Sequence, residues 1–244
     1  MEVSGGWCFS ETVTVSERGQ IVFPAEVGPK NWINPIVMIC FLDYWNFRVL
    51  QITGRFTMNY YDDPNNVQDY IKMAEGYDGR ELVEVLIKYL PEAAAILELG
   101  MGPGVGLDLL SQYYRVTGSD NSQIFLDRYR EKNEAADLLL LDARTLQTSR
   151  SFDGIYSNKV LHHLSEEELK ESFLKQKDIL LPQGIAFHSF WLGDREEFIE
   201  GLRFRYYSEN LLISMVDSHF EVLEAAQYAE FEAGDSLYLV HKKA

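Results

Sequence analysis

The chain has 244 residues, of which 46% are apolar and 25% are charged, and its net charge is −16. This composition excludes a disordered chain and indicates a soluble globular protein, large enough for one large domain or for one domain with a small appendage. The negative charge disfavours binding to nucleic acid or to an anionic membrane, so we expect a small molecule or a protein as partner.

The first predicted elements are four strands at residues 12–15, 20–23, 36–42 and 47–52, rich in β-branched and aromatic residues and separated by glycine, proline and asparagine. Residues 1–58 hold four basic and five acidic residues, so nearly all of the negative charge lies in the remainder. These features predict a small β-rich N-terminal extension over residues 1–58 and a separate domain over residues 59–244.

From about residue 59 the pattern changes to alternating helices and strands. A broken helical pattern over 64–90 is followed by helices at 107–114, 123–133, 166–180 and 209–218, and by strands at 94–100, 114–120, 137–143, 152–158, 184–191, 220–230 and 236–243. Ser165 and Glu168 form a capping box at one helix start. The alternation predicts an α/β fold: a doubly wound, mostly parallel sheet with helices on both faces and an antiparallel pair at one edge.

Two cysteines, Cys8 and Cys40, lie far apart and form no CxxC pattern, so neither a zinc site nor a disulfide scaffold is expected. The first residues, MEVSGGW, lack the basic start of a secretory signal, and the longest apolar run, residues 36–42, is too short to cross a bilayer. We therefore expect a cytoplasmic protein with no membrane segment and no metal.

A glycine-rich segment follows the predicted strand at 94–100. Residues 96–110 read ILELGMGPGVGLDLL, with glycine at every second position from Gly100 to Gly106. In a doubly wound sheet ligands lie at the carboxyl ends of the strands, where glycines permit a tight turn and a close backbone approach, and the next helix offers unpaired N–H groups. A nucleotide-like ligand is therefore expected. The glycine spacing does not fit GxGxxG, which disfavours a nicotinamide-dependent enzyme.

The pattern ExGxGxG from Glu98 to Gly104 resembles motif I of the class I S-adenosylmethionine-dependent methyltransferases, and the resemblance covers about residues 60–243. It implies a Rossmann-like, seven-stranded sheet with an antiparallel last strand, and S-adenosyl-L-methionine as cofactor. The cofactor-binding residues that the resemblance implies are Glu98, Gly100, Gly102, Gly104, Asp120, Asn121, Asp142, Ala143, Asn158, Tyr70 and Tyr77.

The resemblance also assigns roles to some of these residues. Asp120, after the second strand of the domain, would accept hydrogen bonds from the two ribose hydroxyls, a task that suits the acceptor-only oxygens of a carboxylate. Asp142, after the third strand, would lie near the exocyclic amine of adenine. Tyr70 and Tyr77 would reach the carboxylate of the cofactor. The structural alternatives are a tight turn for the glycines, a helix cap for Asp120 and an exposed loop acid for Asp142.

Methyl transfer from a sulfonium requires alignment of the reactants, and a general base only if the acceptor loses a proton as it attacks. The candidate bases are His162, His163 and His188, with a structural role as the alternative for each. The chain has neither an NPPY-like tetrapeptide nor a Pro-Cys pair of the kinds used on nucleic-acid bases. We therefore expect a small-molecule acceptor, methylated on oxygen, nitrogen or carbon.

Residues 11–27, ETVTVSERGQIVFPAEV, carry a second resemblance, which weakens toward residue 53. Through Arg18, Gly19, Gln20 and Pro24 they resemble the opening of swapped-hairpin (AbrB-type) DNA-binding domains, but GPKNWINP replaces the family's basic segment. The alternatives for this extension are DNA binding, a homodimer formed through it, and a chance β-rich segment. The rival to the enzyme hypothesis is therefore a cofactor-sensing transcriptional regulator that binds DNA through these hairpins.

Overall fold

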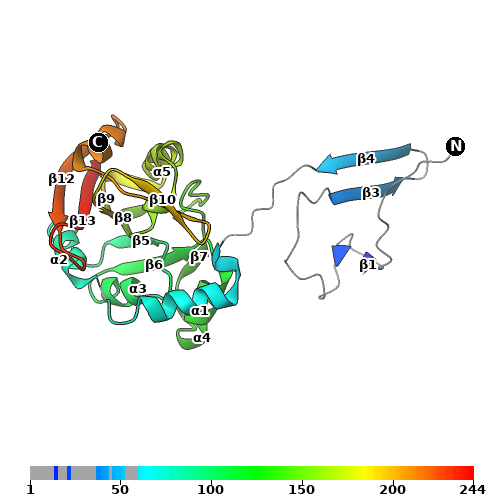
Figure 1. Ribbon diagram of the computed structural model, residues 1–244, viewed down its shortest axis with the longest axis horizontal. Helices are drawn as coiled ribbons and strands as arrows, with labels where there is room; N and C mark the ends of the chain where they lie inside the picture. Colours follow the sequence, from blue (N-terminus) through cyan, green and yellow to red (C-terminus); the bar gives the residue numbers. More distant parts are fainter. Residues whose placement is uncertain (1–13, 16–20, 23–36, 44–45, 53–59, 78) are drawn as a thin grey trace. The chain divides into compact units, whose positions relative to one another are not determined.

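The computed structural model describes residues 14–15, 21–22, 37–43, 46–52, 60–77 and 79–244. The chain divides into two compact units, residues 1–57 and 58–244. In the first unit β1 (Thr14–Val15) pairs with β2 (Ile21–Val22), and β3 (Val37–Asp43) pairs with β4 (Asn46–Ile52), both antiparallel (Figure 1). The likeness of this unit to swapped-hairpin domains, and a homodimer formed through it, stay predictions.

The second unit is built on a seven-stranded sheet with the strand order β12-β13-β9-β8-β5-β6-β7. Every strand except β13 runs in one direction, because β13 is antiparallel to both of its neighbours. The predicted seven-stranded sheet with an antiparallel last strand is thus confirmed. Its strands are β5 (Ala95–Leu99), β6 (Arg115–Asp120), β7 (Leu138–Leu140), β8 (Phe152–Asn158), β9 (Leu180–Trp191), β12 (Phe220–Tyr228) and β13 (Ser236–Lys243).

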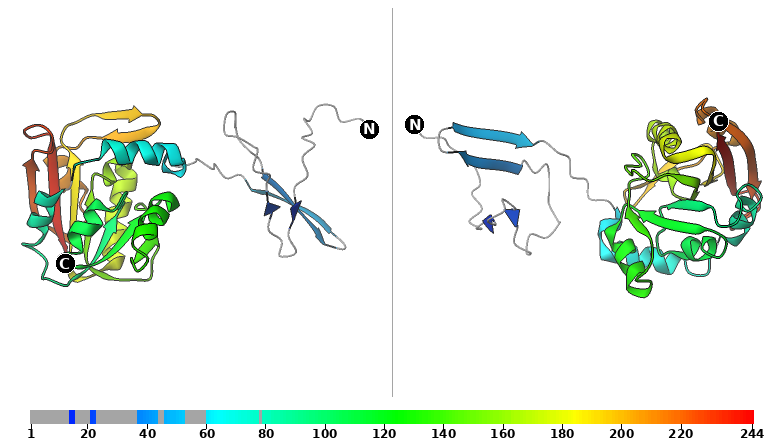
Figure 2. Two further views of the ribbon diagram at one scale, coloured as in Figure 1. Left: turned by 90° about the horizontal axis from the view of Figure 1, so that it is seen from below. Right: turned by 180° about the vertical axis from the view of Figure 1, so that it is seen from behind.

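Helices cover both faces of this sheet (Figure 2). On one face α2 (Arg80–Leu86) and α3 (Val105–Leu110) pack against apolar strand residues such as Tyr156 and Phe187. On the other face α5 (Glu166–Ile179) and α6 (Glu209–Met215) pack against strand residues such as Phe190 and Leu239. The alternation of side chains along each buried strand therefore supplies both layers of the core.

The predicted helical segment 64–90 contains two helices, α1 (Pro64–Met73) and α2, because Gly76 and Gly79 adopt left-handed backbone angles between them. Asp63 caps α1 by accepting a hydrogen bond from the Asn65 backbone N–H, and Pro64 occupies the first turn. The capping box predicted at Ser165 and Glu168 is present at the start of α5.

The strand predicted at 184–191 begins earlier, at Leu180. Pro182 therefore lies within β9 and does not follow the helix as a separate stop. The pairing with β8 jumps from Leu180 to Ile185, so Pro182 falls in an irregular stretch where its missing N–H leaves no gap in the ladder.

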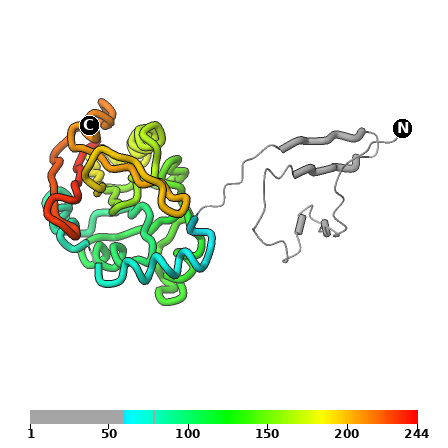
Figure 3. The backbone as a smooth tube through the Cα atoms, in the orientation of Figure 1, coloured from blue at the N-terminus to red at the C-terminus, as the bar shows by residue number. Residues whose placement is uncertain are grey.

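The sequence predicts neither a helix nor a strand for residues 192–207, yet they contain a hairpin of β10 (Glu196–Ile199) and β11 (Leu202–Arg205). Ion pairs hold it: Arg203 contacts Glu196 at 2.6 Å, and Arg205 contacts Glu166 at the start of α5 at 3.0 Å. At its tip, Glu200 accepts a hydrogen bond from the Tyr60 hydroxyl at 2.5 Å. The hairpin thereby reaches η1 (Tyr60–Asp62) at the start of the unit (Figure 3).

The remaining elements are α4 (Gln123–Lys132), which follows β6, and η2 (Leu161–His163), which follows β8. Among the described residues no helix is both long and apolar enough to cross a membrane. The same residues contain no group of three or more His, Cys, Asp or Glu side chains placed to hold a metal ion. A cytoplasmic location stays a prediction from the sequence.

A buried histidine on β13 makes the stability of this fold sensitive to acid. Within the described part of the chain, neither ring nitrogen of His241 has a hydrogen-bond partner. The ring packs edge-on against Phe173 and Phe220, and burial lowers its pKa to about 3. Below about pH 6.5 the unfolded chain therefore binds a proton at this histidine, whereas the folded protein does not.

We predict that His241→Leu removes part of this acid sensitivity. The stability that neutral His241 contributes in the wild type is fully present above the pKa that this histidine has in the unfolded chain. It is lost as the pH falls toward its pKa in the folded protein, about 3. The free energy of unfolding of the variant minus that of wild type should be about 2 kcal/mol larger at pH 5 than at pH 8. Urea unfolding followed by far-UV circular dichroism at both pH values measures this, and an equal difference at the two pH values would contradict it.

Candidate cofactor and active site

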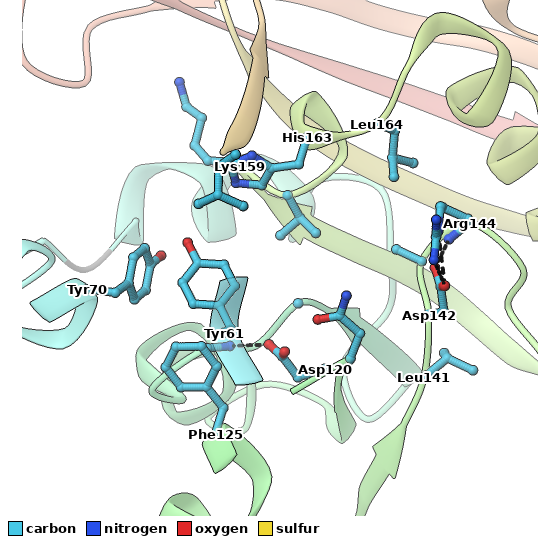
Figure 4. Close-up of a pocket in the computed structure, with 16 residues that line it drawn as sticks. Tyr61, Tyr70, Asp120, Phe125, Leu141, Asp142, Arg144, Lys159, His163 and Leu164 are labelled. Carbon is cyan, nitrogen blue, oxygen red and sulfur yellow. Dashed lines mark hydrogen bonds and ion pairs between the residues drawn. The ribbon is translucent and has the colours of Figure 1, made fainter. Parts of the chain in front are cut away.

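A cavity opens at the carboxyl ends of β5, β6, β7 and β8, where the strand order reverses between β5 and β8 (Figure 4). The cavity holds about 130 Å³ of accessible space and is open to solvent at its mouth. Its lining residues are Tyr61, Tyr70, Gly100, Gly102, Asp120, Asn121, Phe125, Leu141, Asp142, Ala143, Arg144, Lys159, Val160, His163, Leu164 and Leu202.

The glycine turn forms one side of the cavity, and its glycines serve different purposes. A Cβ atom on Gly100 would lie 2.6 Å from the Val160 side chain, and one on Gly104 would lie 2.2 Å from the Tyr129 ring. A Cβ on Gly102, where φ is +51°, would meet only Tyr70, at an ordinary 3.5 Å. Gly100 and Gly104 therefore allow the chain to pack on itself, whereas Gly102 keeps the main chain bare toward the cavity.

Asp120 ends β6 with its side chain 6% exposed. One carboxylate oxygen accepts a hydrogen bond from the backbone N–H of Gly102, and the other accepts one from the N–H of Ser122, each at 2.9 Å. Burial raises the pKa of Asp120, and these backbone hydrogen bonds oppose the rise. The backbone of Asn121 also donates to this carboxylate. Because the two oxygens together can accept about four hydrogen bonds, an acceptor position remains for a ligand.

Asp142 and Ala143 follow β7 and line the cavity as predicted, but the Asp142 carboxylate already has a partner. Arg144 donates hydrogen bonds to it from Nη2 at 2.5 Å and from Nε at 3.0 Å. Burial alone would raise the pKa of Asp142, but the hydrogen bonds and charge of Arg144 lower it overall. Asp142 thus forms an ion pair at the rim, and its proposed contact with adenine would have to share the carboxylate with Arg144.

Aromatic rings from η1, α1 and α4 close another side of the cavity. The ring centroid of Tyr61 lies 5.4 Å from that of Tyr70 and 5.5 Å from that of Phe125. The Tyr61 carbonyl also accepts a hydrogen bond from Ser122 at 2.7 Å, which fixes η1 against the loop after β6. These rings lie together beside Asp120 in Figure 4 and provide an apolar wall.

His163 is the one candidate base that lines the cavity. Its Nδ1 lies 2.6 Å from the Arg203 carbonyl oxygen, which can only accept, so Nδ1 carries the proton. Burial lowers the pKa of His163, and the bond to Arg203 raises it in part, with a net lowering. The neutral ring therefore keeps Nε2 as a proton acceptor.

The other two candidate histidines do not line the cavity. His188 is completely buried, with Nδ1 2.8 Å from the Ser157 hydroxyl and Nε2 2.9 Å from the Gln176 side-chain oxygen, so both of its nitrogens are engaged inside the core. His162 is 2% exposed, and its ring packs against His163 and Phe204. Burial lowers the pKa of both rings well below the usual value, so we assign neither as the base.

Four of the predicted cofactor residues lie behind the lining. Gly104 begins α3 with left-handed backbone angles. Glu98 is buried with one oxygen directly against Gly106, and burial raises its pKa well above the usual value. Asn158 and Tyr77 contact each other, with the Asn158 amide nitrogen 3.4 Å from the Tyr77 hydroxyl. Their contact with a cofactor stays a prediction.

Several lining residues had no sequence signal as cofactor-site residues. Tyr61 precedes α1 in an unpatterned segment, and Leu202 belongs to the unpredicted hairpin. Arg144 directly follows the predicted pair Asp142 and Ala143, so its position was a usable signal. Lys159 did have a signal, because the methyltransferase resemblance places it with Ser157 and Asn158 at the end of the strand predicted at 152–158. Its left-handed backbone, with φ of +54°, is a strained conformation that often occurs at functional sites.

The comparisons with known proteins agree with this geometry. Residues 96–184 match a family model described as a methyltransferase domain. Over 83 residues the chain is 36% identical to a trans-aconitate 2-methyltransferase of Variovorax paradoxus. That match covers 32% of this chain and 32% of the relative, so about two thirds of the relative's length is not matched.

Two solved structures share the fold. One is an S-adenosylmethionine-dependent methyltransferase of Clostridium acetobutylicum, with a TM-score of 0.60, 14% identity and coverage of 76% of this chain and all of that chain. The other is the 1,6-didemethyltoxoflavin N1-methyltransferase of Burkholderia thailandensis, with a TM-score of 0.59, 18% identity and coverage of 84% and 98%. Residues 96–184 therefore resemble a methyltransferase domain, and the second unit has the fold of the class I S-adenosylmethionine-dependent methyltransferases that the sequence predicted.

We predict that Gly102→Ala and Gly104→Ala separate ligand binding from stability. The methyl group at Gly102 enters the cavity, so Gly102→Ala should weaken S-adenosylhomocysteine binding at least tenfold, with a stability loss of about 1–2 kcal/mol from the left-handed backbone. Gly104→Ala adds a collision with Tyr129 and should lose about 3 kcal/mol or more. Titration calorimetry and thermal unfolding measure the two effects. Wild-type ligand affinity in Gly102→Ala would contradict this assignment.

Proposed function

We propose that the chain is an S-adenosyl-L-methionine-dependent methyltransferase acting on a small-molecule acceptor. The observation that carries the proposal is the pair formed by Asp120 and Gly102. A buried carboxylate that can accept a further hydrogen bond stands beside a bare backbone turn, where an added methyl group would meet only Tyr70. This arrangement suits a ligand with neighbouring hydroxyl groups and an amino-acid portion, and the matched methyltransferase domain over residues 96–184 supports the same ligand.

When bound, S-adenosylmethionine would supply a methyl group on a positively charged sulfur. The residues of the chain would mainly align the two reactants and exclude water. Asp120 and Asn121 would orient the nucleoside, Gly102 would admit the amino-acid portion, and Tyr61 with Tyr70 would shield the reacting end. His163 would accept the proton that an O–H or N–H acceptor loses as it attacks.

The named substrates of the relatives indicate the class of acceptor. The relatives with named substrates act on small molecules, trans-aconitate in one case and 1,6-didemethyltoxoflavin in the other. No comparison supports the rival regulator that binds DNA through residues 1–58, and the net charge of −16 opposes contact with phosphates. We therefore propose a small-molecule acceptor.

Calorimetric titration of the full chain tests the cofactor assignment. We expect both S-adenosylmethionine and S-adenosylhomocysteine to bind. Asp120→Asn should weaken binding of both by at least about tenfold, because a hydrogen bond to a charged group contributes about 1.5–3 kcal/mol. Asp127→Asn, an exposed acid on α4, serves as the matched control and should bind as wild type does. Absence of heat for both ligands with wild-type protein would overturn the proposed function.

Replacement of His163 tests the proton acceptor. In His163→Asn the amide can still donate to the Arg203 carbonyl, but no basic nitrogen remains, so turnover should fall by about 10²–10⁴-fold while S-adenosylhomocysteine affinity stays unchanged. Because burial lowers the pKa of His163, wild-type activity should decline only below about pH 6.5. Methyl transfer from labelled cofactor measures both, with His219→Asn as an exposed control. Unchanged turnover in His163→Asn would remove the base assignment.

A further inference from the structure

A second polar cluster lies directly behind the cavity, where the ends of β8 and β9 meet the turn between β12 and β13. Lys159 lines the cavity, and its Nζ leads away from it to three acceptors. These are the Phe190 carbonyl at 3.1 Å, the Ser236 hydroxyl at 2.6 Å and Oε2 of Glu230 at 3.1 Å. All three ammonium protons are thus used, and Lys159 ties the β12–β13 turn to the end of β8.

Glu230 is the carboxylate of this cluster, and its side chain is 5% exposed. Oε2 accepts hydrogen bonds from both Lys159 and the Tyr228 hydroxyl, the latter at 2.8 Å. Within the described part of the chain no hydrogen bond to Oε1 is found. Oε1 is not among the buried atoms that lack a partner, so solvent reaches it and it can accept a hydrogen bond from a ligand. The charge of the carboxylate is already balanced by Lys159, so the ligand group need only donate a hydrogen bond.

Three aromatic residues from distant parts of the sequence border this carboxylate, and we call them the aromatic shelf: Tyr77, Trp191 and Phe231. Trp191 and Phe231 stack with centroids 6.0 Å apart and planes inclined by 20°, and Phe231 contacts Tyr77 at 6.3 Å. Nζ of Lys159 lies 3.4 Å from the centre of the Trp191 ring, which fixes that ring. Phe231 is nevertheless 74% exposed, an unusual position for a phenylalanine.

The shelf adjoins the cavity at the end of β8. Tyr77 contacts Asn158 at the end of β8, and Lys159 belongs to the cavity lining. Tyr70 belongs to the cavity lining as well, and burial, with the charges of Asp120 and Glu230, raises its pKa to about 12. The turn itself is rigid, since Asp235 accepts backbone hydrogen bonds from Glu230, Phe231 and Glu232 at 2.9–3.0 Å.

We propose that Glu230 and the aromatic shelf form the acceptor subsite, and that the acceptor is a flat, uncharged aromatic or heteroaromatic ring bearing an N–H or O–H donor. This inference rests on the proposed function. The ring would lie against Phe231 and Trp191, and its donor would bind Oε1 of Glu230. An aliphatic polycarboxylate, by contrast, would place negative charge against Glu230 in a protein that already carries −16.

Ligand-observed NMR on the full chain saturated with S-adenosylhomocysteine tests this subsite. The probes are 8-hydroxyquinoline, catechol and xanthine, compared with trans-aconitate and citrate. We expect saturation transfer to at least one aromatic probe and none to the two aliphatic acids. Binding of an aliphatic acid in preference to every aromatic probe, or no binding of any aromatic probe, would overturn the proposal.

Two variants assign the contacts of a probe that binds. Glu230→Gln should weaken it about tenfold, whereas Glu232→Gln, an exposed acid in the same turn, should leave its affinity unchanged. Phe231→Ser should also weaken it, with Phe198→Ser, at 60% exposure, as the matched control. Wild-type probe affinity in both Glu230→Gln and Phe231→Ser would refute the subsite. S-adenosylhomocysteine affinity, measured separately, should be unchanged in all four variants, so failure here is distinguishable from failure of the proposed function.

Discussion

The hydrogen bond from the Gly102 backbone to the Asp120 carboxylate is the constraint on which the rest of the site depends. It joins the turn after β5 to the end of β6, beside a backbone hydrogen bond from the Met101 N–H to the Ser119 carbonyl at 2.8 Å. A second tie, from the Ser119 hydroxyl to the Glu98 carbonyl, lies one step deeper. Together these two hydrogen bonds hold the Gly102 turn and the Asp120 carboxylate at a fixed distance. The site is therefore preorganised, and a ligand does not have to pay the entropy cost of ordering it.

The part of the site formed by Gly102 and Asp120 was predictable from the sequence, because each of these residues is recognised by its place next to a strand. Glycine directly after a strand and an acid at the end of the next strand need no knowledge of distant contacts, since parallel strands deliver their carboxyl ends to one edge. The seven-stranded fold was predictable for the same reason, from alternating helix and strand patterns. The pattern did not distinguish the glycines, however: Gly104 faces Tyr129, and only the packing shows that Gly102 faces the cavity.

The other features of the site depend on the direction in which side chains point and on contacts between residues that are far apart in the sequence. His188 was a candidate base, but the residue lies on the face of β9 covered by α5, where Gln176 binds its ring. Because β9 begins irregularly at Leu180, a strand predicted at 184–191 did not show on which face of the sheet His188 would lie. Lys159 and Glu230 are far apart in sequence, so no local pattern links them. The strands of the β10–β11 hairpin have only four residues each, so the alternation of apolar and charged residues in β11 is a short signal.

The two halves of the cavity are therefore held by different forces. The donor half consists of main chain and of strand ends inside the sheet, where a change of conformation would disrupt the core. The acceptor half is carried by a turn and a hairpin fixed through ion pairs, Lys159 with Glu230 and Arg203 with Glu196, together with a few aromatic contacts. Side chains of the hairpin can change at small cost to the sheet, because exposed ion pairs such as Arg203 with Glu196 contribute little to folding stability. The buried pair of Lys159 and Glu230 is the costly contact in this half, because removal of one partner leaves a buried charge. A fold organised in this way can keep one methyl donor while its acceptor changes.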